Sequence, residues 1–349
     1  MSASTASDPR AQVHGGGPSR SGRWGRAGVA VACGALAGTA VITLCRFWTG
    51  LQELGTPTLT LAGLSGPLTI AGAVAVLGGA AWARHFGTRW AAWWALTAIV
   101  PVLLVAQYAR PTLMGLVTAE GPSPGVHLTV LAQNMWYHSS EQDEQVETLL
   151  DEDADVYVLT EFTPEALDGL RERHVERRYP FSVLRPEPGR LGMAVLSRVP
   201  LQVRAADEFR IMVDLSPPDA VPLHLIATHS PAASSVGIES WHDELDELAD
   251  MARLAGPDTV VAGDLNATAG HVAFRELVAS AALTDAQDAG GGGFAGTWNL
   301  MATVPPLLRL DHVLVGRDVA VHRFRFASRI DSDHQGIAAE IVAAPKEGS

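Results

Sequence analysis

The chain is poor in cysteine, which excludes a disulfide-built fold. Its 349 residues contain only Cys33 and Cys45, and both lie in or beside an apolar run near the N-terminus. Two such cysteines cannot form a disulfide framework. The region after residue 120 contains no thiol at all, so its chemistry must rest on other side chains.

Acidic residues are almost absent from the first 120 positions and abundant afterwards. The first segment holds Asp8, Glu53 and Glu120 against eight arginines, a net charge near +5. Because the whole chain carries −13, the remainder carries about −18. Duplex DNA binding normally rests on clustered Lys and Arg, which so acidic a region lacks. The charge argues against a polyanion-tracking groove but leaves small or lipid-linked phosphates open.

Three hydrophobic runs account for the high hydrophobic content of 47%. They extend from about Ala27 to Leu44, Leu59 to Trp82, and Trp90 to Tyr108. Each is close to the ~20 residues that a helix needs to cross the hydrocarbon core. We therefore expect a three-helix transmembrane anchor at 27–110, after a disordered cytoplasmic tail at 1–26 and before a linker at 111–126.

Basic residues predict the orientation of this anchor. Four arginines precede the first run, and Arg84 and Arg89 separate the second from the third. The positive-inside rule then places the N-terminus in the cytoplasm, and three crossings leave everything after Arg110 outside. The prediction is a multi-pass cell-membrane protein with an extracytoplasmic domain. A cleaved signal peptide followed by two spans is the alternative, and it reverses the domain.

From about His127 the pattern changes to short apolar runs that alternate with polar, helix-like segments. The expected helices are Glu141–Asp151, Pro164–Arg173, Ser240–Leu254 and Val272–Ala281. The expected strands are Leu128–Asn134, Val156–Thr160, Met193–Ser197, Leu223–Thr228, Thr259–Gly263, His312–Val315 and Ile337–Ile341. Strands that are apolar along their length indicate a sheet covered on both faces. The fold class is α/β, with one domain at 127–343 and a short tail at 344–349.

Residues able to bind a metal or move a proton stand at the ends of these strands. They are Asn134, Glu161, His229, Asp264, Asn266, Asp311, Asp333 and His334. Singly, each has an ordinary structural explanation: a helix cap for Glu161, a turn for Asn134 or Asp264-Leu265-Asn266, a hydrogen-bonded core edge for His229. The eight residues fall into six clusters along the chain, and six such coincidences in one domain favour a shared site.

The motifs that carry these residues resemble the endonuclease/exonuclease/phosphatase superfamily, whose fold is DNase I-like. They are Gln133-Asn134, Leu159-Thr160-Glu161, Thr228-His229, Gly263-Asp264-Leu265-Asn266, Leu310-Asp311-His312 and Ser332-Asp333-His334. The resemblance implies a four-layer α/β sandwich here preceded by three transmembrane helices. The arrangement is also similar to a membrane-anchored actinobacterial branch, some of whose members are linked to resistance to glycopeptides such as teicoplanin and vancomycin.

The resemblance implies a role for each position. Glu161, with Asn134 and Asp333 beside it, is expected to bind Mg²⁺ or Mn²⁺, which prefer oxygen ligands. Asp264 is expected to orient or deprotonate a water and Asn266 to donate to the phosphoryl group. His334, oriented by Asp311, and His229 are expected to contact the phosphate, and which group protonates the leaving oxygen stays open. His312 and Trp298 are more readily explained by packing, and Arg309 by either phosphate contact or a carboxylate pair.

These expectations converge on a metal-dependent phosphoester hydrolase acting outside the cytoplasm. Its expected partners are the membrane and a phosphorylated lipid or cell-envelope intermediate, hydrolysed as a monoester, diester or pyrophosphate. One alternative is an extracellular metal-dependent nuclease, although no basic groove interleaved with aromatics is present. The other is a catalytically inactive binding module.

Overall fold

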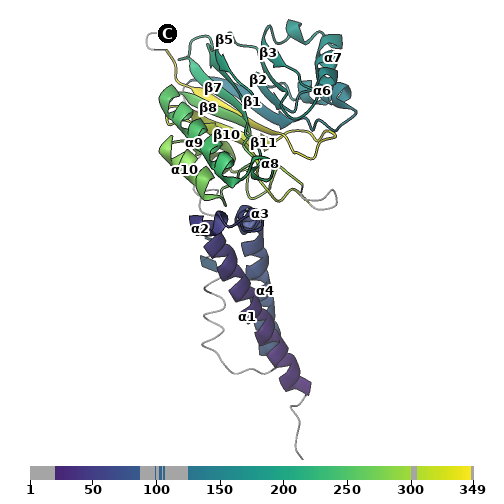
Figure 1. Cartoon of the computed structure of the whole chain (residues 1–349), viewed down its shortest axis with the longest axis vertical. Helices are drawn as coiled ribbons and strands as arrows, with labels where there is room; N and C mark the ends of the chain where they lie inside the picture. The colour runs from purple at the N-terminus through teal and green to yellow at the C-terminus, as the bar shows by residue number, and fades with distance from the viewer. Residues whose placement is uncertain are drawn as a thin grey trace, which may run out of the picture.

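A helical hairpin projects from one side of an α/β domain (Figure 1). The computed structural model describes residues 20–86, 125–299 and 305–346, together with positions 99, 102, 103, 105 and 106. Helices α1 (Arg20–Phe47) and α4 (Ser65–His85) form the hairpin. Both are long and apolar enough to cross a membrane by length and composition.

The two hairpin helices pack closely because small residues line their contact. The indole Nε1 of Trp82, near the end of α4, donates to the carbonyl of Trp24, near the start of α1, at 3.2 Å. The helices are therefore antiparallel. A Cβ atom on Gly28 would lie 2.7 Å from the backbone nitrogen of Ala83, so only glycine permits this approach. Small residues have the same effect in packed membrane helices.

The anchor differs from the sequence prediction in its boundaries. The second apolar helix begins at Ser65 rather than Leu59, because residues 59–63 belong to the separate helix α3 (Thr56–Gly63), which follows α2 (Thr49–Gln52). Helix α1 begins at Arg20, so residues 20–26 are helical rather than part of a disordered tail. The expected third span, at 90–108, lies mainly outside the described residues, as do most of the linker and residues 347–349 of the C-terminal tail.

Two mixed six-stranded sheets form the centre of the domain. The first has the order β11 (Ala320–Phe326), β12 (Ile337–Ala343), β1 (Val126–Asn134), β2 (Val156–Thr160), β4 (Met193–Ser197), β3 (Phe181–Arg185). The second has the order β5 (Leu201–Ala206), β6 (Arg210–Leu215), β7 (Leu223–His229), β8 (Thr259–Asp264), β10 (Asp311–Val315), β9 (Thr284–Asp285). The neighbours β1 and β2 are parallel, as are β7 and β8, and the other pairs are antiparallel.

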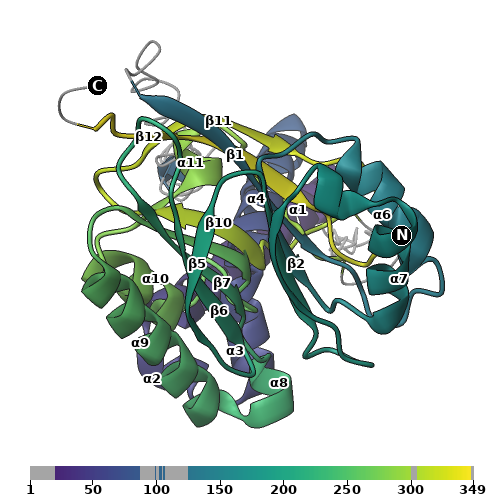
Figure 2. The same cartoon turned by 90° about the horizontal axis from the view of Figure 1, so that it is seen from above.

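Helices cover the outer face of each sheet, as Figure 2 shows from above. Helices α6 (Gln142–Leu150) and α7 (Pro164–Glu172) cover the first sheet, and α9 (Ile238–Ala255) and α10 (Val272–Ser280) the second. The described part of the domain also has three short helical elements, which are η1 (Val175–Arg177), α8 (Ala233–Val236) and α11 (Ala286–Ala289).

Side-chain alternation explains why the central strands are apolar along their length. In β1, Val130 and Ala132 join the core between the two sheets, whereas Leu131 packs under α6 and α7. Successive strand residues point to opposite faces, and here both faces are covered. The structure therefore has the four layers predicted, helix, sheet, sheet and helix.

The expected strands and helices all occur, with boundaries within two residues for the helices. Strands β3, β5, β6, β9 and β11 are not among the predicted elements. Of these, β3, β5 and β11 are at or next to a sheet edge and are largely half-buried or exposed, so their composition is mixed. Such strands lack the continuous apolar signal of central ones.

Candidate active site

Strand pairing brings the polar strand ends together. The parallel pair β1 and β2 aligns Asn134 with Thr160, immediately before Glu161. The parallel pair β7 and β8 aligns His229 with Asp264, and β10 places Asp311 opposite Asp264 on the other side. Carboxyl ends of parallel strands meet at one edge of a sheet, and the two sheets present theirs to the same region.

Unusual backbone conformations direct two of these side chains into that region. Glu161 has φ +52° and Asn266 has φ +46°, both in the left-handed region that residues other than glycine seldom adopt. The turn at Glu161 is held by Gln142, whose amide donates to the Glu161 carbonyl at 3.1 Å. Strained conformations of this kind concentrate at functional sites, where the surrounding structure enforces them.

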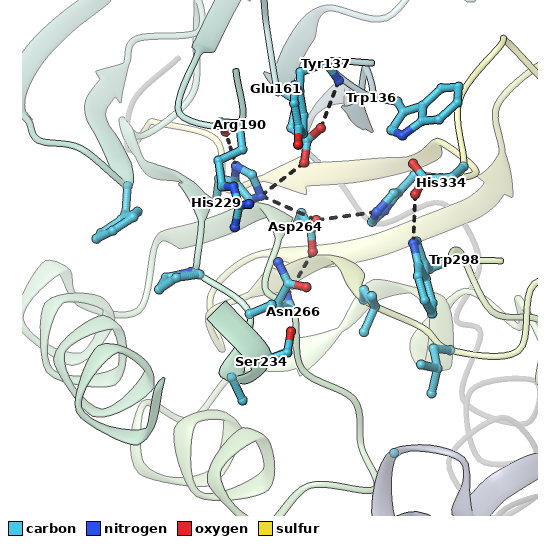
Figure 3. A pocket seen from close by; sticks show the side chains of 18 of the residues that line it. Trp136, Tyr137, Glu161, Arg190, His229, Ser234, Asp264, Asn266, Trp298 and His334 are labelled. Carbon is cyan, nitrogen blue, oxygen red and sulfur yellow. Dashed lines mark hydrogen bonds and ion pairs between the residues drawn. The ribbon is translucent and has the colours of Figure 1, made fainter. Parts of the chain in front are cut away.

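A pocket of about 460 Å³ lies at this edge and contains six of the eight predicted residues. They are Asp333 together with Glu161, His229, Asp264, Asn266 and His334. Figure 3 labels the last five. The other two lie one hydrogen bond behind the surface. Asn134 donates to Asp264 Oδ2 at 3.0 Å, and Asp311 Oδ2 accepts from His334 Nδ1 at 2.8 Å.

Asp264 is the centre of the arrangement and is 1% exposed. Its Oδ1 accepts from the backbone N–H of Asn266 at 2.9 Å. Its Oδ2 lies 3.7 Å from Nε2 of both His229 and His334 (Figure 3). Burial raises the pKa of Asp264; the two histidines oppose that rise and the Asp311 carboxylate adds to it. Asp264 is thus a rigidly held carboxylate with raised proton affinity.

The two histidines differ in their partners. Burial alone lowers the pKa of His334, but the Asp311 and Asp264 carboxylates outweigh burial and raise this pKa to about 10. His334 is therefore a cation at neutral pH. His229 Nδ1 lies 2.8 Å from the Arg190 carbonyl, which can only accept, so Nδ1 carries a proton and Nε2 faces Glu161 and Asp264.

Glu161 and Asp333 bring further negative charge into the pocket. Glu161 Oε2 accepts from the Tyr137 N–H at 2.9 Å, and Asp333 Oδ2 accepts from the Trp298 indole at 3.0 Å. The pKa of Asp333 is raised, mainly by burial and in part by the Glu161 carboxylate. Oδ1 of Asp333 is buried and has no hydrogen-bond partner among the described residues. Carboxylate oxygens are the donors that a hard divalent cation prefers, so Glu161 and the free Oδ1 of Asp333 suit such a cation.

A second set of ligand atoms lies close together in the same pocket. One ligand atom each from Asp264, Asp311 and His334 fall within 4.8 Å of one another. Because Asp311 and His334 already bond each other, this group acts more naturally as a hydrogen-bonded relay than as a ligand shell. The Asn134 oxygen accepts from the Trp136 N–H at 2.9 Å and retains one lone pair, so its role as a ligand stays a prediction.

The family model for the endonuclease/exonuclease/phosphatase family matches residues 132–334, which span all eight of these positions. The chain belongs to this family. Its domain is accordingly that of a phosphoester hydrolase, a family in which divalent metals are typical. No curated protein sequence matches the chain closely enough to count as a relative.

Solved structures resemble the chain at low sequence identity. An endonuclease/exonuclease/phosphatase from Beutenbergia cavernae DSM 12333 is 20% identical, with a TM-score of 0.50 over 62% of this chain and 72% of that one. A humanized D. rerio TDP2 is 17% identical, with a TM-score of 0.49 over 62% and 98%. A Bacteroides thetaiotaomicron family protein is 13% identical, with a TM-score of 0.47 over 63% and 99%. The likeness to the Beutenbergia cavernae structure concerns the fold alone.

Neighbouring side chains resolve two questions that the sequence left open. Arg309 forms ion pairs with Asp285 at 3.3 Å and with Asp288 at 2.9 Å, so its guanidinium binds carboxylates rather than phosphate. His312 bonds Asp285 at 2.8 Å and faces away from the pocket residues, as expected of a structural residue. Trp298 both lines the pocket and bonds Asp333.

Several pocket residues were not predicted at all. Arg190 and Tyr137 contribute backbone groups that bond His229 and Glu161, and backbone groups leave no mark on sequence composition. Thr56, Leu59, Thr60 and Gly63 belong to α3, which the sequence assigned in part to a transmembrane span. The family motifs give no signal for these four residues, because they lie outside the matched region.

Proposed function

We propose that this protein is a membrane-anchored, divalent-metal-dependent phosphoester hydrolase that acts outside the cytoplasm on a phosphorylated lipid or another cell-envelope intermediate. The observation that carries the proposal is that one pocket holds the carboxylates of Glu161, Asp264 and Asp333 together with His229 and His334. Phosphoesters resist attack because their anionic oxygens repel a nucleophile, so a site must supply positive charge and an aligned water.

The residues of the pocket divide that work. Glu161 and Asp333 would hold the cation, with Asn134 behind them, and the cation supplies charge against the phosphate oxygens. Asp264, fixed by hydrogen bonds from Asn134 and Asn266, orients an incoming water and takes its proton. His334, kept cationic by Asp311, binds the phosphate.

Two further groups complete the site. The amide Nδ2 of Asn266 donates one hydrogen to the Ser230 carbonyl at 2.9 Å, which leaves its second hydrogen for the charge that develops on the phosphoryl group. His229 presents Nε2 to the pocket. Protonation of the leaving oxygen falls to His229, His334 or a water molecule.

Exposed apolar side chains on the hairpin support membrane anchoring. Val31, Leu44, Val74 and Trp82 are 55%, 54%, 66% and 49% exposed within the described residues. An apolar surface of this kind is costly in water and favourable in hydrocarbon. The hairpin projects away from the domain, as a membrane-spanning pair would (Figure 1).

The positions of the arginines support an extracytoplasmic domain. The start of α1, with Arg23 and Arg26, and the end of α4, with Arg84, lie together at the end of the hairpin far from the domain (Figure 1). Positive residues favour the cytoplasmic side. The segment that connects α1 to α4 then lies outside the cytoplasm, on the same side of the membrane as the domain. An alkaline phosphatase reporter fused after Ser349 is expected to be active, and activity of a cytoplasmic reporter there would reject this orientation.

The decisive experiment is a screen of the full-length protein in detergent for phosphoester hydrolysis with Mg²⁺ or Mn²⁺. Lipid monophosphates, diphosphates and phosphodiesters are compared with DNA and RNA. We expect turnover of a lipid substrate, with Glu161→Gln lowering the rate by roughly 100-fold or more. Glu165→Gln, an exposed glutamate four residues further on, is the matched control and should retain the wild-type rate.

Other outcomes of this screen separate the alternatives. Robust, salt-sensitive cleavage of DNA with no lipid turnover would favour the extracellular nuclease. Absence of turnover on every phosphoester, in a folded protein, would favour the inactive binding module. The link to glycopeptide resistance stays a prediction, checked by comparing teicoplanin and vancomycin susceptibility of cells expressing wild-type protein and Glu161→Gln.

A further inference from the structure

The connector between the two apolar helices, residues 48–64, is bonded to the catalytic domain. Gln52 is fully buried, and its side chain bonds the domain twice: Nε2 donates to the Gly270 carbonyl at 3.3 Å, and Oε1 accepts from the Val272 N–H at 3.0 Å. The Arg275 guanidinium donates to the Arg46 carbonyl at the end of α1, at 2.7 Å. These bonds link α1 and α2 to the start of α10.

The second half of the connector, α3, is held even more closely. His271 Nε2 lies 3.1 Å from the Leu59 carbonyl, and Thr268 Oγ1 donates to the Gly63 carbonyl at 3.3 Å. A Cβ atom on Gly270 would lie 1.9 Å from the Ala62 carbonyl oxygen, so the two backbones touch. Helix α3 thus packs against the loop that follows Asp264 and Asn266 in the chain.

One face of α3 forms a wall of the catalytic pocket. Thr56, Leu59, Thr60 and Gly63 line the same pocket as Glu161, Asp264 and His334. Their spacing of three, one and three residues places them on a single face of the helix. Phe209 and Leu308 also line this pocket, so apolar surface adjoins the charged residues.

The α3 wall of the pocket lies next to the start of the apolar helix α4. Helix α4 begins at Ser65, two residues after α3 ends, and α3 lies where the hairpin meets the domain (Figure 1). A molecule that extends from the catalytic residues along α3 therefore reaches the start of an apolar helix. The wall carries no acidic side chain: the connector's one acid, Glu53, is exposed and does not line the pocket.

We propose that this face of α3 binds the apolar chain of a lipid phosphoester, in the segment next to the phosphate, while the phosphate lies among Glu161, Asp264 and His334. The proposal rests on the proposed hydrolase function and adds a specificity element that the anchor, rather than the catalytic domain, supplies. The methyl and methylene groups of Leu59 and the threonines suit a hydrocarbon chain. A soluble phosphoester of the same linkage lacks the group that this surface binds.

The test compares substrates that share a reacting group and differ in their chain. The pairs are farnesyl and methyl monophosphate, farnesyl and methyl diphosphate, and hexadecyl and methyl p-nitrophenyl phosphodiester. Full-length protein in detergent is assayed with Mg²⁺ for kcat/KM on each pair. For the linkage that is hydrolysed, we expect the chain-bearing substrate to be preferred by about 100-fold, since each buried methylene adds to binding.

Variants at Thr60 then locate the origin of this preference. Thr60→Gln places a neutral amide on the wall and is expected to reduce the preference about 10-fold or more, mainly through KM, because a polar group is poorly accommodated beside hydrocarbon. Thr60→Val, of similar volume, should retain it. Pro57→Gln is the control, because Pro57 is exposed on the same helix and does not line the pocket.

The outcomes distinguish this proposal from the function on which it rests. Hydrolysis of both members of a pair at equal kcat/KM, or an unchanged preference in Thr60→Gln, would overturn the α3 subsite and leave the hydrolase intact. If the wild-type protein hydrolyses none of the six substrates, both the α3 subsite and the proposed hydrolase function are contradicted. Thr60 is exposed, so thermal melts of the variants should match wild type and exclude loss of folding as the cause.

Discussion

His271 joins the catalytic domain to the connector, and its protonation should weaken the fold. The residue is 7% exposed, and both ring nitrogens are hydrogen-bonded in the neutral state. Nδ1 accepts from the Thr268 N–H at 3.1 Å, and Nε2 donates to the Leu59 carbonyl at 3.1 Å. A second proton would have to enter on Nδ1, directly against that N–H. Burial lowers the pKa of His271 to about 4, and the charges of Arg275 and His242 also disfavour the cation.

The sign of the effect follows from the direction of this shift. In the unfolded chain a histidine titrates near pH 6.5, whereas folded His271 stays neutral until about pH 4. Above pH 6.5 His271 is neutral in both the folded and the unfolded state, and its full contribution to the free energy of unfolding is present. Between pH 6.5 and 4 only the unfolded state gains the proton, so stability falls as the pH falls. A shift of about 2.5 pKa units, at 1.36 kcal/mol each, corresponds to a loss of roughly 3 kcal/mol.

Unfolding of the full-length protein in detergent, followed at pH values from 7.5 to 4, measures this loss. His271→Gln keeps a neutral donor for the Leu59 carbonyl and cannot be protonated, so its stability should depend less on pH than that of wild type. His322→Gln, at an exposed histidine on β11, should keep the wild-type dependence. Identical pH dependence in wild type and His271→Gln would refute the reasoning.

Three further predictions concern the catalytic domain. Asp311→Asn removes the carboxylate that orients His334 at 2.8 Å, and kcat should fall by about 100-fold or more while circular dichroism is unchanged. Gly263→Ala should prevent folding or lower the melting temperature sharply. The new Cβ would lie 2.0 Å from the Thr228 carbonyl oxygen, and Gly263 has a φ of +138° that alanine rarely adopts. A melting temperature equal to that of wild type would contradict this. Arg210→Met leaves Glu244 buried without its partner at 2.6 Å and should cost about 3–5 kcal/mol in chemical unfolding, whereas the double variant Arg210→Met/Glu244→Leu should recover part of that loss.

Much of the domain could be predicted from local sequence because its central strands are buried on both faces. Strands β2 and β4 occur at the predicted residues, and α9 and α10 lie within two residues of theirs. The polar residues that interrupt these apolar runs, such as Glu161 after β2 and Asp264 at the end of β8, marked the edge of the sheet where the pocket lies. Edge strands were missed because their side chains are shared between solvent and core, so no single periodicity dominates.

The amino-acid sequence by itself determined the two-sheet α/β class, the family, and the identity of the polar residues that meet in the pocket. Only the tertiary structure decided how those residues divide: Asn134 and Asp311 behind the surface, and Arg309 paired with Asp285 and Asp288. It also decided that α3 is separate from the apolar helix α4 and forms a wall of the pocket. The physical reason is that Leu59 and His271 are 212 positions apart, and a contact over such a distance depends on the packing of the whole chain rather than on local pattern.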